Sequence, residues 1–255
     1  MTLDKEKRYL MNKPSEILIT GADGGLGQAL VEQFSCSGYS VVATTRGLKP
    51  QFNNWCKELQ ERTGHRVVNE SLILEDAAQA QREAREIVDR NPGIDHFINN
   101  AAMAFGSMIQ LTPLSSLRKV LEINLISQFA IIQIFAKHLL RKGKGSIANI
   151  TSVTANIPLP GTFAYGSSKL ALEYMTRVLA LELENTGIVF SAVELGMVQT
   201  NMLKKMDLKS RDLLLLKDDA ISILEPTYAA KKIFEHLSQL DSKNSGKVIR
   251  IEGEK

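Results

Sequence analysis

Short apolar runs alternate along the chain with longer stretches in which apolar residues recur every three or four positions. The first pattern is typical of buried strands of a parallel sheet, and the second of amphipathic helices. The pattern predicts seven strands, at residues 16–20, 39–45, 65–70, 94–99, 145–151, 188–195 and 247–252. It predicts helices between and after them at about 25–37, 53–63, 75–90, 114–140, 164–186 and 226–239.

This order of elements defines a fold class. Repeated alternation of strand and helix favours an α/β, doubly wound, Rossmann-like sheet of seven mostly parallel strands with helices on both faces. The chain contains no linker rich in proline or glycine, so we expect one domain over residues 14–255. Residues 1–13 form a polar N-terminal lead-in in this interpretation. Residues 196–225 interrupt the alternation, and we expect a lid there.

Composition narrows the class of protein. Of the 255 residues, 44% are hydrophobic and 23% are charged, as in ordinary globular domains. The net charge is only +3, and basic residues are interspersed with acidic ones, so we expect no nucleic-acid partner. The four histidines and two cysteines show no metal-ligand spacing, which predicts no metal site.

The sequence also bears on location. No apolar run approaches the roughly 18 residues that span a bilayer, so we expect no membrane partner. The first sixteen residues contain no apolar core of a secretion signal, and the two cysteines are not in a C-x-x-C pair. We therefore expect reduced thiols and a cytoplasmic location.

A glycine-rich turn, TGADGGLG at 20–27, joins the first strand to the first helix. Two spacings fit it, Gly21-Gly25-Gly27 and Gly21-Gly24-Gly27. Either lets the backbone turn sharply and approach a pyrophosphate, whose charge meets the N-terminus of the helix. The turn therefore predicts a dinucleotide cofactor.

The end of the second strand bears on the choice of dinucleotide. Thr45 stands where enzymes that bind NAD often carry an acid for the ribose 2′-hydroxyl, and Arg46 follows it. A guanidinium pairs well with a phosphate, which favours NADP. Asp23 in the glycine turn opposes a nearby phosphate charge, so NAD stays open as an alternative.

The residues with catalytic potential lie in the second half of the chain. Tyr165 and Lys169 are four apart at the start of a predicted helix and so share one face. A cation beside a phenol lowers the phenol pKa and suits it to proton transfer. Ser152 ends the preceding strand, and the carboxyl end of such a strand faces the ligand crevice. A hydroxyl at that place can bond a substrate carbonyl or alcohol.

These motifs, in this order, resemble the short-chain dehydrogenase/reductase family, from about Ile17 to Gly253. The chain is similar to the one-domain branch of that family. The shared features are the spacing T-G-x3-G-x-G, the pair Y-x3-K and the serine thirteen residues before the tyrosine. That branch uses Gly21, Gly25 and Gly27 and leaves Gly24 in a variable slot. The resemblance implies that the catalytic residues are Asn124, Ser152, Tyr165 and Lys169. It implies that the cofactor-binding residues are Gly21, Asp23, Gly25, Leu26, Gly27, Thr45, Arg46, Asn99, Ala101, Tyr165, Lys169, Val198 and Thr200.

Three positions depart from the family pattern. Ala102 replaces the glycine of the N-N-A-G motif, and Leu195 replaces the proline before the lid. The third departure is at the aspartate that bonds the adenine amino group in the family. Leu72 or Ile73 stands near that place, so we expect adenine to be held mainly by packing, or by Ser71 or a backbone group.

The resemblance implies an NAD(P)-dependent oxidoreductase that interconverts a carbonyl and a secondary alcohol by hydride transfer, with Tyr165 as the acid or base. NADP is the preferred cofactor. Apolar residues in the segments expected to line the pocket, 103–111, 153–163 and 197–216, favour a partly apolar small substrate. A homodimer or homotetramer is expected, because relatives pair the helices at 114–140 and 164–186. Two alternatives remain open: a non-catalytic nucleotide-binding or scaffold protein on the same fold, and a sugar-nucleotide epimerase or dehydratase.

Overall fold

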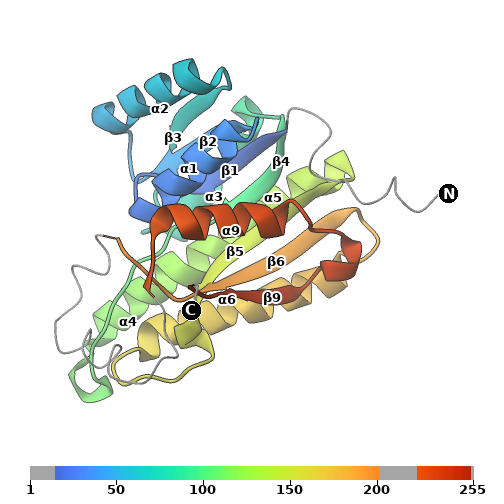
Figure 1. The fold of residues 1–255 in the computed structure, drawn as a ribbon. Coiled ribbons are helices and arrows are strands. Elements are labelled where there is room, and N and C mark those ends of the chain that lie inside the picture. The colour runs from blue at the N-terminus through green and yellow to red at the C-terminus, as the bar shows by residue number, and fades with distance from the viewer. Residues whose placement is uncertain (1–14, 201–222, 254–255) are drawn as a thin grey trace.

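The computed structural model describes residues 15–200 and 223–253. Seven strands form one sheet in the order β3-β2-β1-β4-β5-β6-β9, and every neighbouring pair is parallel. The predicted doubly wound sheet is therefore confirmed (Figure 1). The strands are β1 (Glu16–Thr20), β2 (Ser40–Thr45), β3 (Val67–Ser71), β4 (Ile94–Asn99), β5 (Gly145–Ser152), β6 (Ile188–Leu195) and β9 (Lys247–Ile251).

The helices begin and end where the local sequence provides suitable residues. At α3 (Ala77–Arg90), the side chain of Asp76 accepts a hydrogen bond of 2.7 Å from the backbone N–H of Gln79. At α2 (Pro50–Thr63), Pro50 opens the helix, and Gly64 closes it with a φ of 73°. The other long helices are α1 (Gly25–Cys36), α4 (Leu114–Leu121), α5 (Ser127–Lys142), α6 (Phe163–Glu182) and α9 (Pro226–Leu237).

Alternating side chains of the strands build a core on each face of the sheet. In β1, Ile17 and Ile19 pack with residues of α1, α2 and α9, whereas Leu18 packs on the opposite face with residues of α3 and α5. Figure 1 shows α1 and α9 together on one side of the sheet. Because both faces are covered, the strands read as continuous apolar runs in the sequence.

The helix expected at 114–140 is not one regular α-helix. A π-helical turn, η2 (Glu122–Ile126), separates α4 from α5 and contains Asn124. By length and composition, the continuous stretch Leu114–Lys142 could cross a membrane, the one such helix among the described residues. Of its most apolar window, 61% is buried inside the protein, as in the core helix of a globular domain.

The order of strands places a crevice above β1 and β4, where the chain changes direction across the sheet. The predicted lid is described only at its two ends, where β7 (Met197–Val198) pairs in parallel with β8 (Ile223–Leu224). The remainder of the lid and the predicted lead-in at 1–13 lie outside the described residues.

Candidate active site

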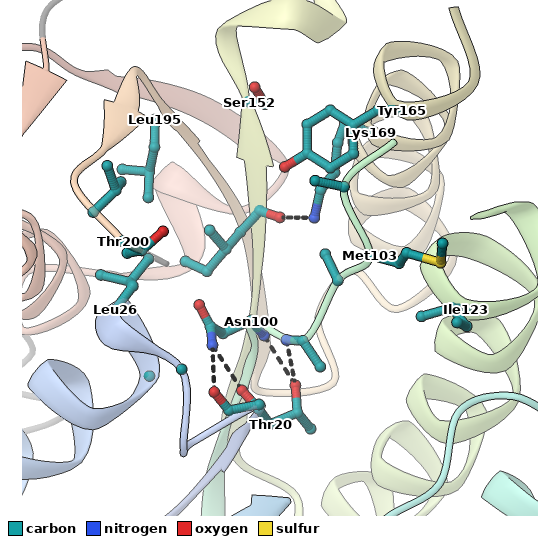
Figure 2. Close-up of a pocket in the computed structure, with 18 of the residues that line it drawn as sticks. Thr20, Leu26, Asn100, Met103, Ile123, Ser152, Tyr165, Lys169, Leu195 and Thr200 are labelled. Carbon is teal, nitrogen blue, oxygen red and sulfur yellow. Dashed lines mark hydrogen bonds between the residues drawn. The ribbon is translucent and has the colours of Figure 1, made fainter. Parts of the chain in front are cut away.

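A cavity of about 660 Å³ opens at the carboxyl ends of β1, β4, β5 and β6. It runs from the end of β2, past the glycine turn after β1, to the start of α6, and Figure 2 shows the part between Thr20 and Tyr165. Most of the residues predicted from the sequence line it together. They are Gly21, Asp23, Gly25, Leu26, Gly27, Thr45, Arg46, Ala101, Ser152, Tyr165, Lys169, Val198 and Thr200.

The geometry of the turn distinguishes its four glycines. Gly21 has a φ of +64°, which favours glycine, and a Cβ on Gly27 would lie 2.1 Å from the carbonyl oxygen of Gly21. A Cβ on Gly25 would lie 2.9 Å from the Thr200 side chain. Gly24 has a φ of −78°, and a Cβ on it would lie 3.3 Å from its nearest neighbour, the Gly21 carbonyl oxygen. The spacing that the fold requires is therefore Gly21-Gly25-Gly27, and Gly24 is the glycine that can be replaced.

Two ion pairs lie at the end of the cavity beside β2. Arg46 contacts Glu75 at 3.1 Å, and Lys49 contacts Asp23. All four residues line the cavity, and the Arg46 side chain is 73% exposed. Thr45 is buried, and its hydroxyl is used within the fold, where it donates to the Gly47 carbonyl at 2.7 Å. This end of the cavity therefore holds two cations whose charges are balanced by nearby carboxylates.

The cavity has an apolar surface near the position where the resembled family carries the aspartate that bonds the adenine amino group. Leu72 and Leu74 line the cavity, whereas Ile73 does not. Leu195, which replaces the usual proline, continues β6 to the end and pairs in register with Ser152. Both departures from the family pattern thus leave the cavity intact.

The two asparagines of the segment 99–102 have different surroundings. Asn99, predicted to bind the cofactor, is buried outside the cavity lining, where its amide donates to Asn149 at 2.9 Å. Asn100 lines the cavity and donates to the Thr20 carbonyl at 2.8 Å (Figure 2). Neighbouring residues at a strand end point to opposite faces, so Asn100 and not Asn99 presents its side chain to the cavity.

Ser152, Tyr165 and Lys169 converge at the other end of the cavity (Figure 2). The Ser152 and Tyr165 side chains lie in the same part of the cavity lining. The Lys169 Nζ lies 5.6 Å from the centre of the Tyr165 ring and donates to the Ile150 carbonyl at 2.9 Å. A phenol, a hydroxyl and a buried amine from two elements therefore meet at one point of the wall.

The pKa values at this point differ from the expectation. Burial raises the pKa of Tyr165 to about 12, and the Ser152 side chain opposes that rise. Burial lowers the pKa of Lys169 to about 8. The sequence predicts a phenol pKa lowered by the lysine, but in the free protein desolvation dominates because the ring lies in a low-dielectric wall. Tyr165 therefore carries its proton at neutral pH.

Asn124 lies behind the cavity wall rather than in its lining. Its side chain accepts from the Met103 N–H at 2.7 Å and donates to the Met103 carbonyl at 2.9 Å. It also donates to the Ser168 hydroxyl at 3.2 Å. The side-chain amide is thus occupied in joining three segments of the wall. The π-helical turn that contains it is of a kind often found at functional sites.

Several lining residues escaped the sequence analysis. Lys49 and Glu75 come from the loops after β2 and β3, whereas Thr154 was expected in the lining only as part of the segment 153–163, with no role of its own. Lys49 follows Arg46 closely and offered a signal, as a second basic residue after the strand. No pattern in the sequence indicates the role of Thr154, because that role depends on the direction in which its hydroxyl points.

The fold and the site together define a dinucleotide-dependent oxidoreductase. A glycine turn of this geometry suits a pyrophosphate at the N-terminus of α1, and the polar cluster lies at the far end of the same cavity. Comparison with known proteins identifies the family. The family model "short chain dehydrogenase" matches residues 15–211, and the chain belongs to this family of oxidoreductases, which act between CH–OH and C=O.

Individual relatives agree with this assignment. The chain is similar to a 3-amino-tetrahydro-pyrrolizinone reductase of Xenorhabdus hominickii, at 31% identity over 78% of this chain and 66% of that protein. It is 28% identical to the 3-oxoacyl-acyl-carrier-protein reductase FabG of Thermotoga maritima, over 92% of this chain and 95% of that one. A solved short chain dehydrogenase of Burkholderia cenocepacia, in complex with NADP, has a TM-score of 0.83 at 21% identity, covering 95% of this chain and 98% of that chain.

Proposed function

We propose that this protein is an NADPH-dependent reductase of a partly apolar ketone. The observation that carries the proposal is the convergence of Ser152, Tyr165 and Lys169 in the same cavity as the glycine turn. When bound beside the glycine turn, NADPH would supply the hydride for the carbonyl carbon of the substrate. The protein supplies the proton and the geometry, so that carbonyl and alcohol are interconverted.

Each residue of the cluster has a distinct role in the proposal. Tyr165 gives its proton to the oxygen of the substrate, and its raised pKa keeps that proton in place at neutral pH. Ser152 binds the same oxygen and stabilises the charge that develops on it. Lys169 binds the ribose hydroxyls and electrostatically assists the loss of the tyrosine proton. Asn124 belongs to a proton relay that restores the proton from solvent, and the structure gives it a second role in holding Met103.

The preference for NADPH rests on the charges beside β2. At the place where an acid would receive a ribose 2′-hydroxyl, Thr45 turns its hydroxyl into the fold. Asp23, which opposes a phosphate on sequence grounds, is paired with Lys49. Arg46 and Lys49 therefore form the subsite proposed for the 2′-phosphate, and the Burkholderia relative with NADP bound is consistent with it.

The character of the substrate follows from the other end of the cavity. Met103, Phe105, Val153, Pro160 and Met197 line it, and they present mostly apolar surface next to the Ser152 and Tyr165 hydroxyls. The similar proteins include the 3-oxoacyl-acyl-carrier-protein reductase and an estradiol 17-beta-dehydrogenase of Rattus norvegicus, which is 28% identical over 75% of this chain and 50% of that protein. A ketone with an apolar body fits this lining better than a sugar phosphate does.

We also propose a homo-oligomer in the cytoplasm. Apolar side chains stand exposed on neighbouring helices, among them Phe129 of α5 (54% exposed) and Tyr174 of α6 (67% exposed). A contiguous apolar patch marks a contact site in soluble proteins, and we propose that these side chains belong to such a patch. Both cysteines are free thiols, which fits a reducing compartment.

Cofactor titration followed by turnover tests the proposal. We expect NADPH to bind at least ten times more tightly than NADH, measured by cofactor fluorescence. Arg46→Ala should weaken NADPH binding by roughly tenfold, as loss of a charged hydrogen bond does, and leave NADH within twofold. NADPH consumption should then follow with acetoacetyl-CoA, cyclohexanone or estrone as the ketone. Binding of cofactor without turnover of any of the three would point instead to the non-catalytic alternative.

A further inference from the structure

The hydroxyl of Ser152 is already engaged by the residue two positions further on. Thr154 donates to Ser152 Oγ from its hydroxyl at 3.0 Å and from its backbone N–H at 3.3 Å. A serine hydroxyl has two lone pairs and one proton. Because both lone pairs receive bonds from Thr154, Ser152 is left with its proton to donate.

Thr154 is held in place from the side of α6. A Cβ on Gly166 would lie 2.6 Å from the Thr154 carbonyl oxygen, so the absence of a side chain lets this carbonyl rest directly on the helix. Gly166 is the residue after Tyr165. The contact that positions Thr154 therefore also fixes the loop relative to the phenol.

A polar network with two buried carboxylates anchors the other end of the same loop. The Asn156 side-chain amide donates to Glu173 at 3.0 Å and to Glu194 at 2.5 Å. Both carboxylates are almost fully buried, and Arg250 of β9 pairs with Glu194. The segment from Ser152 to Asn156 is thus fixed at both ends. This holds the Thr154 hydroxyl in one orientation toward Ser152.

The direction of the Ser152 proton affects the reaction. A serine with a free lone pair would accept a hydrogen bond from the Tyr165 hydroxyl and so engage the proton that Tyr165 must give to the substrate. A serine limited to donating instead points its proton at an acceptor, which is the substrate oxygen or the tyrosinate. Hydrogen bonds in such a chain also polarise one another, which strengthens the last donor.

We propose that Thr154 is a positioning residue of the reaction, which occupies the lone pairs of Ser152 so that the serine proton is directed at the substrate oxygen. This role rests on the proposed carbonyl reduction. Thr154 touches the cavity but need not touch the substrate, because it acts through Ser152. The hydroxyl of residue 154, rather than its bulk, is the feature that matters.

A double-mutant cycle tests this role with NADPH and the three probe ketones. The variants are Thr154→Val, which keeps the shape and removes the hydroxyl, Thr154→Ser, which keeps the hydroxyl, Ser152→Ala and the double variant. Thr186→Val is the matched control, because that hydroxyl bonds the Leu183 carbonyl at 2.6 Å and lies outside the cavity lining. Thermal unfolding and NADPH titration of each variant check that the fold and the cofactor site are intact.

We expect Thr154→Val to lower kcat/KM by roughly five- to tenfold, as loss of one hydrogen bond does, with NADPH affinity unchanged. Thr154→Ser and Thr186→Val should stay within twofold of the wild type. In the Ser152→Ala background, Thr154→Val should cause no further loss, because the partner through which it acts is absent. In the alcohol-oxidation pH profile, Thr154→Val should raise the apparent pKa, because the bond that stabilises the tyrosinate weakens.

The opposite results are as informative. Wild-type activity in Thr154→Val, an equal loss in the Ser152→Ala background, or a Thr154→Ser variant as slow as Thr154→Val would overturn the role of Thr154 and leave the proposed function standing. A wild-type protein that binds NADPH and reduces none of the three ketones would overturn both proposals.

Discussion

The substitution Gly166→Ala separates the stability of α6 from the geometry of the site. Gly166 lies within α6, where alanine is favoured over glycine by about 0.5–1 kcal/mol. The new Cβ would lie 2.6 Å from the Thr154 carbonyl oxygen, which is about 0.8 Å short of the 3.4 Å at which ordinary van der Waals contact begins. The helix carries the buried side chains of Lys169 and Glu173, so we expect the loop rather than the helix to move.

A displacement of this size is large for a reacting geometry. Misplacement by about 1 Å can cost on the order of 100-fold in rate, so we expect kcat/KM to fall by roughly 10- to 100-fold. Overpacking typically costs about 1–3 kcal/mol, which the gain in helix propensity partly offsets. The net change should lower the Tm by no more than about 10 °C, given about 2–4 °C per kcal/mol for a domain of this size.

The assay is steady-state reduction of the best probe ketone, beside thermal unfolding and NADPH titration. Ser167→Ala is the control, because it changes the next residue of the same helix, and the Ser167 hydroxyl bonds only within the helix. Its activity should match the wild type. A Gly166→Ala protein with wild-type kcat/KM would refute the reasoning, since it would show that the contact with Thr154 does not set the geometry of the site.

Three further predictions concern the cofactor, the buried lysine and the surface. Gly24→Arg, at the replaceable glycine of the turn, should tighten NADPH binding by roughly tenfold and leave NADH binding within twofold, as measured by fluorescence titration. Lys169→Met should abolish turnover yet raise the Tm at pH 7. Burial lowers the pKa of Lys169 from 10.5 to about 8. The buried lysine therefore reduces the free energy of unfolding of the wild type as the pH falls from 10.5 to about 8, and the full cost remains at lower pH. The gain in Tm of Lys169→Met should accordingly shrink as the buffer pH is raised above 8. Tyr174→Glu should convert the oligomer to a particle of 28.2 kDa by light scattering, and a wild type already of that mass would contradict the proposed assembly.

The outline of the fold could be predicted because its signals are local. In β1, apolar residues alternate between two covered faces, and this produces the continuous run that identifies a parallel strand. The spacing of Tyr165 and Lys169 places both on one face of a helix wherever that helix lies. The regular helix expected at 114–140 was wrong in detail, because the π-helical turn around Asn124 accompanies a tertiary bond to Met103.

The site was predictable only where one segment decides its own geometry. The glycine turn could be found from its sequence, but its spacing alone left Gly24 and Gly25 as alternatives. The family resemblance chose Gly25, and in the structure the contact with Thr200 distinguishes it. Only the structure shows that Asn100 and not Asn99 faces the cavity, because the order of residues in a motif does not state which face of the strand each one occupies. Lys49 and Glu75 come from different loops, and their pairing with Asp23 and Arg46 is a matter of three-dimensional proximity.

The sequence by itself determined the succession of strands and helices, the turn that receives a dinucleotide, and the serine, tyrosine and lysine that can carry out proton transfer. These features depend on spacing along the chain, and spacing can be read from the sequence without knowledge of which segments pack together. The tertiary structure alone decided the pKa values, the charge balance beside β2 and the engagement of Ser152 by Thr154. Each of these depends on burial or on contacts between segments, and desolvation is a sum over surroundings that no single stretch of sequence contains.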